Sequence, residues 1–259
     1  MKAMPPALLV SIPASNYVEK ARWALQLAEI PFEEEKHIAL LAYRSTMPKG
    51  GKSVPLLKTS SFVLTDSSDI LQYCAQKLPS LYPNDEAKKL ELYYDTELGP
   101  HLRRFTYYMV FKDTAAAKRV LLQPLDSWFE FLLAWLLFPL IKFLICQGML
   151  IDEENAMKSW AKAVTVLEEQ EAKLGDGPVG SQYLAGPTFS AADISFCAHM
   201  SLIVHPPEHK YISPYVTDDN IPPELRERVH KLRQSKLGQY VSWGYENHRP
   251  DMMVTIPKK

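Results

Sequence analysis

The first eighty residues alternate short apolar runs with segments whose apolar positions recur at helical spacing. An apolar run at residues 7–12 ends at Pro13, a pattern typical of a buried strand. In the next segment the apolar positions at helical spacing are Val18, Ala21, Leu25 and Ala28. Pro31 ends this pattern, so the sequence predicts a strand followed by a helix.

The same alternation continues to about residue 77. Residues 32–40 predict a more exposed strand and its exit. Two short strands are expected at 53–59 and 61–65, joined as a hairpin, and a helix at 67–77. The order strand, helix, strand, loop or short helix, strand, strand, helix indicates a small α/β domain.

The second half of the chain has a different pattern. Residues 78–87 carry two prolines and are typical of a linker. Beyond them no segment predicts a strand, so this half is expected to be helical. The helical patterns cover residues 85–111, 124–150, 153–174, a segment that begins at Ser190, and 223–240.

One apolar run within the helical half needs a separate interpretation. Residues 131–141 are all apolar, with Glu130 and Lys142 on either side and Pro139 inside the run. A membrane-spanning helix needs about 20 such residues. We therefore expect a buried core helix with one side at an interface, and no membrane span.

Composition adds bounds on the protein class. With 259 residues, 47 % of them hydrophobic, the chain is long enough for two packed domains. The net charge of −1 gives no reason to expect nucleic acid or an anionic membrane surface as a partner. The three cysteines are far apart and show no metal-binding spacing, and the apolar stretch at residues 3–10 is too short for the signal-peptide pattern. We expect a cytoplasmic protein without a metal.

Four motifs in order along the chain carry a family resemblance. They are SNYVEKARWAL at 15–25, SVPLL at 53–57, TDSSDI at 65–70 and YLAGPTFSAADISF at 183–196. Together they resemble the cytosolic glutathione transferase superfamily, in its serine-type members, with no class assigned. The resemblance implies a thioredoxin-like α/β domain at residues 1–83, which binds glutathione, and an all-α domain at 84–259.

The resemblance assigns the catalytic role to Ser15, whose hydroxyl would stabilise the glutathione thiolate. The N-terminus of the helix after Ser15 also favours an anion, because its first N–H groups are free and this end of the helix dipole is positive. Ser15 is equally well placed as a simple N-cap. Ser11 and Tyr17 are the alternatives, and Tyr17 is more readily explained by packing against the second domain. Cysteine-type thiol transfer is not expected, because no cysteine lies near Ser15.

The same resemblance implies the glutathione contacts. Val54 would pair its backbone with the cysteinyl part, and Pro55 would follow a cis peptide bond. Asp66 and Ser67, before a helix, would hold the glutamyl end, although the family more often has Glu or Gln in place of Asp66. Lys52 would reach the glycyl carboxylate. Each of these residues also has a plain structural reading, as an edge proline, a helix cap or a solvated lysine.

In the helical domain the motifs are structural. Ser190 and Asp193 have the spacing of a capping box at the start of a buried helix. Tyr107, Tyr108 and Phe111 are candidate liners of the electrophile site between the domains, although aromatic residues at such spacing are more often core.

The resulting functional hypothesis is a glutathione transferase. It would conjugate or reduce small hydrophobic electrophiles or peroxides in detoxification, with glutathione as co-substrate, and would act as a homodimer. The alternative is a non-catalytic protein of the same fold that binds glutathione or hydrophobic ligands. The sequence does not identify the second substrate, because such a site has no readable side-chain code.

Overall fold

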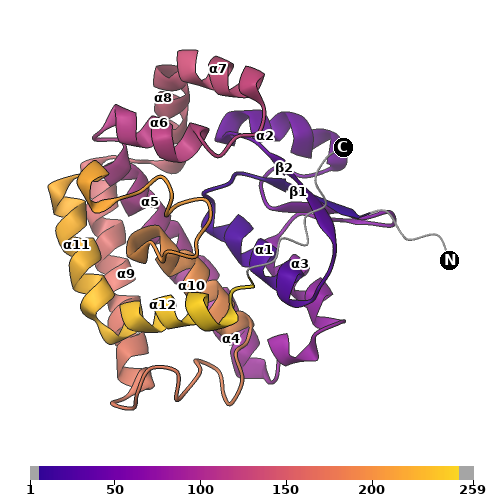
Figure 1. The fold of residues 1–259 in the computed structure, drawn as a ribbon, viewed down its shortest axis with the longest axis vertical. Coiled ribbons are helices and arrows are strands. Elements are labelled where there is room, and N and C mark those ends of the chain that lie inside the picture. Colours follow the sequence, from indigo (N-terminus) through magenta and orange to yellow (C-terminus); the bar gives the residue numbers. More distant parts are fainter. Residues whose placement is uncertain (1–5, 251–259) are drawn as a thin grey trace.

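The computed structural model describes residues 6–250 (Figure 1). Its four-stranded sheet consists of β1 (Ala7–Ser11), β2 (Phe32–Lys36), β3 (Leu56–Lys58) and β4 (Val63–Leu64), in the order β2-β1-β3-β4. β1 pairs in parallel with β2 and antiparallel with β3, and β3 pairs antiparallel with β4. Central β1 is almost fully buried, which explains why its first four residues are all apolar.

Three helices complete the N-terminal part: α1 (Asn16–Leu27), α2 (Ala39–Thr46) and α3 (Ser67–Ala75), with short 3₁₀ turns at Met47–Lys49 and Pro79–Leu81. α1 packs against α3 and against α10 (Ala191–Val204) of the helical part. Even its polar residues are buried for this reason, among them Lys20 and Arg22. The prediction of a small thioredoxin-like domain is confirmed.

The remainder is helical. The helices are α4 (Asp85–Tyr93), α5 (Gly99–Val110), α6 (Thr114–Leu122), α7 (Trp128–Leu136), α8 (Phe138–Met149), α9 (Glu153–Leu174), α10 (Ala191–Val204), α11 (Pro223–Gln234) and α12 (Lys236–His248). A π-helical segment, Tyr94–Leu98, joins α4 to α5, and a 3₁₀ turn covers Asp218–Asn220. Every residue of α10 is buried, because α1, α4, α5, α11 and α12 surround it.

The start of α10 is held by the capping box of Ser190 and Asp193. One Asp193 carboxylate oxygen accepts from the Ser190 backbone N–H at 2.8 Å, and the other accepts from the Leu184 backbone N–H at 2.9 Å and from the Tyr240 hydroxyl. One buried carboxylate therefore fixes the helix start, the loop before it and α12.

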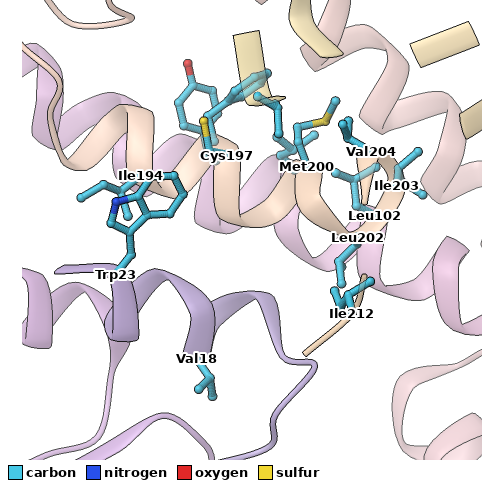
Figure 2. Packing of buried hydrophobic residues seen from close by; sticks show 14 of the residues in the cluster. Val18, Trp23, Leu102, Ile194, Cys197, Met200, Leu202, Ile203, Val204 and Ile212 are labelled. Atoms are coloured by element: carbon cyan, nitrogen blue, oxygen red, sulfur yellow. The ribbon is translucent and has the colours of Figure 1, made fainter. Parts of the chain in front are cut away.

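The domains share one core (Figure 2). Trp23 of α1 faces Ile194 and Cys197 of α10, while Val18 points to the opposite side of α1; all four belong to the same buried cluster. The Trp23 indole N–H donates to the His248 carbonyl at 2.9 Å. The N-terminal domain is thus fixed on the helical domain by apolar packing as well as by polar contacts.

Three helical predictions need correction. The stretch 124–150 forms two helices, α7 and α8, which meet at an angle of 78°. α6 occupies a stretch for which no helix was expected. The predicted helix 223–240 is divided at Ser235, whose hydroxyl accepts from the Gly238 N–H and caps α12. A Cβ at Gly238 would lie 1.9 Å from the Leu232 carbonyl oxygen, so only glycine permits this close approach.

The apolar run is not the buried core helix that the sequence predicts. In Figure 1, α7 and α8 stand at the top edge beside α2 and α6. Most of their large apolar side chains face outward, with Trp128 76 % exposed, while Phe138 and Ile141 face the core. Among the described residues no single helix is long and apolar enough to cross a membrane; α7 and α8 together reach the necessary length and composition, with the 78° bend between them.

Candidate active site

A pocket of about 370 Å³ lies where the first strand gives way to the first helix. The N-terminal domain supplies the β1–α1 connection, α2 and the turn before β3, and the helical domain supplies α5, α8 and α10. Its lining consists of Ile12, Ala14, Ser15, Asn16, Ala39, Leu40, Ala42, Tyr43, Thr46, Ser53, Val54, Arg103, Tyr107, Leu144, Ile145, Gly148, Met149 and Leu202. The volume suits a small organic molecule or peptide.

Ser15 lies on the wall of this pocket as the N-cap of α1. Its backbone is extended, and its Oγ accepts from the Val18 backbone N–H at 3.4 Å. Because Oγ acts as an acceptor there, its own proton is available to a group in the pocket. The first N–H groups of α1 add a positive end of the helix dipole at the same place.

The hydroxyls of the two alternatives to Ser15 donate to backbone carbonyls away from the pocket. Ser11 is fully buried and its hydroxyl faces the Glu35 carbonyl at 3.5 Å. Tyr17 donates its hydroxyl proton to the Asp95 carbonyl at 2.8 Å, against the helical domain. Burial raises the pKa of the Tyr17 phenol well above its usual value. Neither residue lines the pocket in the described structure.

The turn before β3 brings backbone to the pocket. The Val54–Pro55 peptide bond is cis, as the resemblance implies, and Ser53 and Val54 line the pocket. Lys52 is exposed and lies outside the lining.

Asp66 and Ser67 stand at the N-terminus of α3. Asp66 is the exposed N-cap, and its Oδ1 accepts from the Ser68 backbone N–H at 2.7 Å. Ser67 is buried in the first turn. Both residues lie outside the lining of the pocket.

Of the three aromatic candidates, Tyr107 lines the pocket. Tyr108 lines a different hollow, with the Lys112 ammonium 4.9 Å from its ring centre. Phe111 is buried behind Tyr107, with ring centres 5.3 Å apart.

The structure adds three polar residues that the sequence analysis did not assign to the site. Asn16, Thr46 and Arg103 line the pocket, and each has one buried polar atom without a hydrogen-bond partner within the described chain: Oδ1, Oγ1 and Nε respectively. These side chains give the otherwise largely apolar lining a polar part. One signal was available: Arg103 is four residues before Tyr107 and therefore shares its helix face.

Asn16 also connects the pocket to a buried polar network. Its amide Nδ2 is 2.8 Å from His199 Nδ1, and His199 Nε2 is 2.8 Å from Asp95 Oδ1. Since the amide donates to Nδ1, the histidine carries its proton on Nε2 and donates it to Asp95. Burial lowers the pKa of His199 in spite of this carboxylate, which is consistent with a neutral ring.

Lys20 is the cation of this network. Its ammonium donates to Glu91, Asp95 and the Ser68 hydroxyl, and it is fully buried. Burial alone would raise the pKa of Asp95, but His199 and Lys20 outweigh it and hold that pKa well below its usual range. The network therefore joins α1 and α3 to α4, the π-helical segment and α10 beneath the pocket.

The described residues contain no group of three or more His, Cys, Asp or Glu side chains placed to hold a metal ion. The cysteines are unpaired thiols, and none of them lines the pocket. Burial raises the pKa of the Cys74 thiol to about 12.

Comparisons with known proteins agree with this architecture. Residues 9–84 match the family model of the glutathione S-transferase N-terminal domain. The theta class glutathione S-transferase of Xanthomonas axonopodis pv. citri, solved with glutathione bound, is 19 % identical with a TM-score of 0.53, over 92 % of this chain and 98 % of that chain. Poplar glutathione transferase F1 is 19 % identical with a TM-score of 0.53, over 94 % and 99 %. Glutathione transferase GSTFuA3 of Phanerochaete chrysosporium is 13 % identical with a TM-score of 0.64, over 94 % and 97 %. No curated protein sequence matches the chain.

The fold and pocket thus define a two-domain protein, with a thioredoxin-like domain fixed on an all-helical one. Residues 9–84 thus have the N-terminal domain of glutathione S-transferases, and the chain as a whole has the fold of the solved glutathione transferases.

Proposed function

We propose that this protein is an enzyme that transfers glutathione to small apolar electrophiles, or reduces peroxides with it, and that Ser15 stabilises the thiolate. The observation that carries the proposal is the pocket itself. A hydroxyl at a helix N-terminus, the backbone beside a cis-proline and the polar residues Asn16, Thr46 and Arg103 line one cavity between the domains.

The chemical role of Ser15 follows from its hydrogen bond. The Val18 N–H donates to Oγ and polarises the hydroxyl, which strengthens its own donation to sulfur. A free thiol has a pKa of about 8.5, and each unit of depression corresponds to about 1.4 kcal/mol. The helix dipole and the Arg103 guanidinium, which also lines the pocket, act in the same direction.

The glutathione contacts are proposed from the family resemblance, and of the residues concerned only Val54 lines the pocket. Val54 offers its backbone N–H and C=O to the cysteinyl part of the peptide. Asp66 and Ser67, at the start of α3, take the glutamyl ammonium and carboxylate, and exposed Lys52 takes the glycyl carboxylate. The electrophile lies against the apolar wall opposite Ser15, which consists of Tyr107, Leu144, Ile145, Met149 and Leu202.

Substitution of Ser15 tests the catalytic role. In Ser15→Ala we expect kcat to fall by about 10²-fold, as on removal of one donor to a developing anion. The pKa of bound glutathione, followed by thiolate absorbance, should rise toward about 8.5, while glutathione affinity is retained. Ser11→Ala is the control and should leave turnover unchanged. Unchanged turnover in Ser15→Ala would refute the role given to Ser15.

A specific observation favours the alternative of a non-catalytic binding protein. A second, smaller cavity of about 40 Å³ adjoins the pocket and shares Ala14, Tyr107 and Leu202 with it, and its lining is mostly apolar. Displacement of a fluorescent apolar ligand, together with no conjugation of any electrophile in a panel, would favour this function over catalysis.

The homodimer, the cytoplasmic location and the role in detoxification stay predictions that rest on the resemblance. Sedimentation of the purified chain over a range of concentrations tests the first of them.

A further inference from the structure

The outward side of α7 and α8 is an apolar surface. Among the described residues, eleven large apolar side chains of this region are 38–76 % exposed: Trp128, Phe129, Phe131, Leu132, Trp135, Leu136, Leu137, Leu140, Phe143, Leu144 and Leu150. We call them the outer face. At roughly 200 Å² for a large side chain, the exposed area is on the order of 1,000 Å², more than the few hundred Å² of a typical exposed patch.

Charged groups are turned away from the outer face. Between Trp128 and Leu150 the charged residues are Glu130 and Lys142. Glu130 accepts from the Ile38 backbone N–H at 2.7 Å, and Lys142 donates to the Phe111 carbonyl at 2.5 Å. Gln147 is the only exposed polar side chain in this fully described stretch. The surface therefore offers almost no hydrogen-bonding group to whatever covers it.

A basic hollow borders the outer face. It lies between α6 and α7, has a volume of about 290 Å³, and is lined by Lys118 and Arg119 beside Phe131 and Trp135. The Lys118 ammonium lies 4.1 Å from the centre of the Trp135 ring. Its lining in the described structure contains no carboxylate. The net charge of −1 conceals this local cluster of positive charge.

We infer that the outer face docks on the surface of an anionic lipid bilayer. α7 and α8 would lie in the boundary between headgroups and acyl chains, where tryptophan is favoured, and Lys118 and Arg119 would meet lipid phosphates. The bend of 78° between the helices keeps both in this boundary rather than across the bilayer.

Two observations favour a bilayer over a second copy of the chain. A protein interface of ordinary size contains about ten hydrogen bonds, which the outer face does not supply, whereas acyl chains require none. A two-fold interface here would also bring the two basic hollows toward each other without acidic partners.

The outer face also reaches the mouth of the pocket. Leu144 is 41 % exposed and lines the pocket, as does Tyr43, which is 45 % exposed. A second copy of the chain would close this mouth, whereas a bilayer would deliver apolar molecules to it. If the protein is the glutathione transferase proposed above, its substrates are therefore electrophiles dissolved in the membrane; this step rests on the proposed function.

The test is sedimentation with vesicles of phosphatidylcholine alone and of phosphatidylcholine with phosphatidylglycerol. We expect the protein to bind the anionic vesicles more tightly. Trp128→Ser, Leu136→Ser and Phe143→Ser combined should weaken binding at least tenfold. Phe62→Ser with Leu92→Ser, which are 40 % and 45 % exposed elsewhere, is the control and should bind as the unchanged protein does.

The basic hollow is tested with Lys118→Glu and Arg119→Glu together. This variant should lose the preference for anionic vesicles, whereas Lys88→Glu with Lys89→Glu, the same charge change on the exposed side of α4, should keep it. In the unchanged protein, brominated lipid should quench tryptophan fluorescence, a readout that needs no variant. Ser15→Ala should bind vesicles as the unchanged protein does. Vesicle binding can therefore be measured whether or not Ser15 has the catalytic role proposed above.

Failure to sediment with either vesicle, or no quenching by brominated lipid, would overturn the proposal. A dimer that forms without lipid and is dissociated by the triple serine variant would assign the outer face to a second copy instead.

Discussion

The domain interface buries charged side chains, whereas the outer face exposes apolar ones. Beneath the pocket the molecule buries Lys20 between Glu91 and Asp95, with side chains almost or fully out of solvent. On α7 and α8 it exposes tryptophan, phenylalanine and leucine and turns Glu130 and Lys142 inward. Both arrangements depend on tertiary contacts: Lys20 is buried because α4 and the π-helical segment supply its carboxylate partners, and Glu130 and Lys142 point inward because the Ile38 N–H and the Phe111 carbonyl pair with them.

The contrast indicates different tasks. A buried charge is tolerated only where every partner is held in place, so the interface network fixes the domains and the start of α1 in one arrangement. An exposed apolar face is stable only with an apolar medium or partner outside it. The first region holds the pocket, and the second connects it to its surroundings.

The largest effect is expected from Lys20→Met. The change leaves Glu91 and Asp95 buried without their cation, which costs about 3–5 kcal/mol of unfolding free energy. Urea unfolding at pH 7 measures it. Lys158→Met, which removes an exposed ion pair with Glu154, is the control and should be indistinguishable from the unchanged protein. Equal stability of the two variants would show that the network does not hold the domains together.

The second prediction concerns the loss of folding stability at acidic pH. Burial lowers the pKa of His205 and of His209 to about 4. Because the unfolded chain takes up these protons near pH 6.5 and the folded chain does not, stability is complete above pH 6.5 and falls as the pH drops toward 4. Each histidine contributes up to about 3 kcal/mol to this loss.

Urea unfolding at pH 7.5, 5.5 and 4.5 measures the slope. His205→Asn with His209→Gln should flatten it. Asparagine is chosen for His205 because the residue has φ 51° and asparagine tolerates that conformation. An equally steep slope in the double variant would place the acid sensitivity elsewhere.

The sequence predicted what depends on neighbours along the chain. The apolar run before Pro13 and the helical spacing after it specify β1 and α1, and Ser190 with Asp193 specifies the start of α10. The break between α7 and α8 also had a local signal. Pro139 lies in the first turn of α8, where proline favours a helix start, although the sequence analysis treated it only as an interruption.

What the sequence could not specify depends on distant partners. Lys20 meets Asp95 across 75 residues, and Asn16 meets His199 across 183. No spacing rule connects such pairs. The exposure of residues 131–141 was missed for a related reason. Apolar runs are usually buried, and only the placement of α7 at the edge of the fold reveals that this one is not.

The third prediction compares two neighbours on α8. Ile141 is buried, at 5 % exposure, and Leu140 beside it is 52 % exposed. Ile141→Ala should cost roughly 2 kcal/mol through lost packing, while Leu140→Ala should change stability by less than about 0.5 kcal/mol. With anionic vesicles the order reverses, and Leu140→Ala should weaken binding more. Equal effects on stability would mean that α8 has no distinct inner and outer sides.

The smallest effect concerns the contact that holds α7 to the N-terminal domain. Glu130 accepts from the Ile38 N–H and lies 2.9 Å from His37 Nδ1. The hydrogen bond with Glu130 raises the pKa of His37 above its usual value. This contribution is therefore complete below pH 6.5 and is lost as the pH rises through the raised pKa, opposite in sign to that of the buried histidines.

Glu130→Gln keeps the acceptor for the Ile38 N–H and removes the charge. A partly exposed ion pair contributes at most about 1 kcal/mol, so the loss of stability should be small and confined to the acidic side. NMR titration should show the pKa of His37 moving down toward its usual value, with no shift in Glu33→Gln, a change at a half-buried carboxylate on β2, the strand that ends just before His37. A His37 pKa that is unmoved in Glu130→Gln would mean that Glu35, 2.8 Å from Nε2, holds the proton, and that α7 is attached through its backbone contact alone.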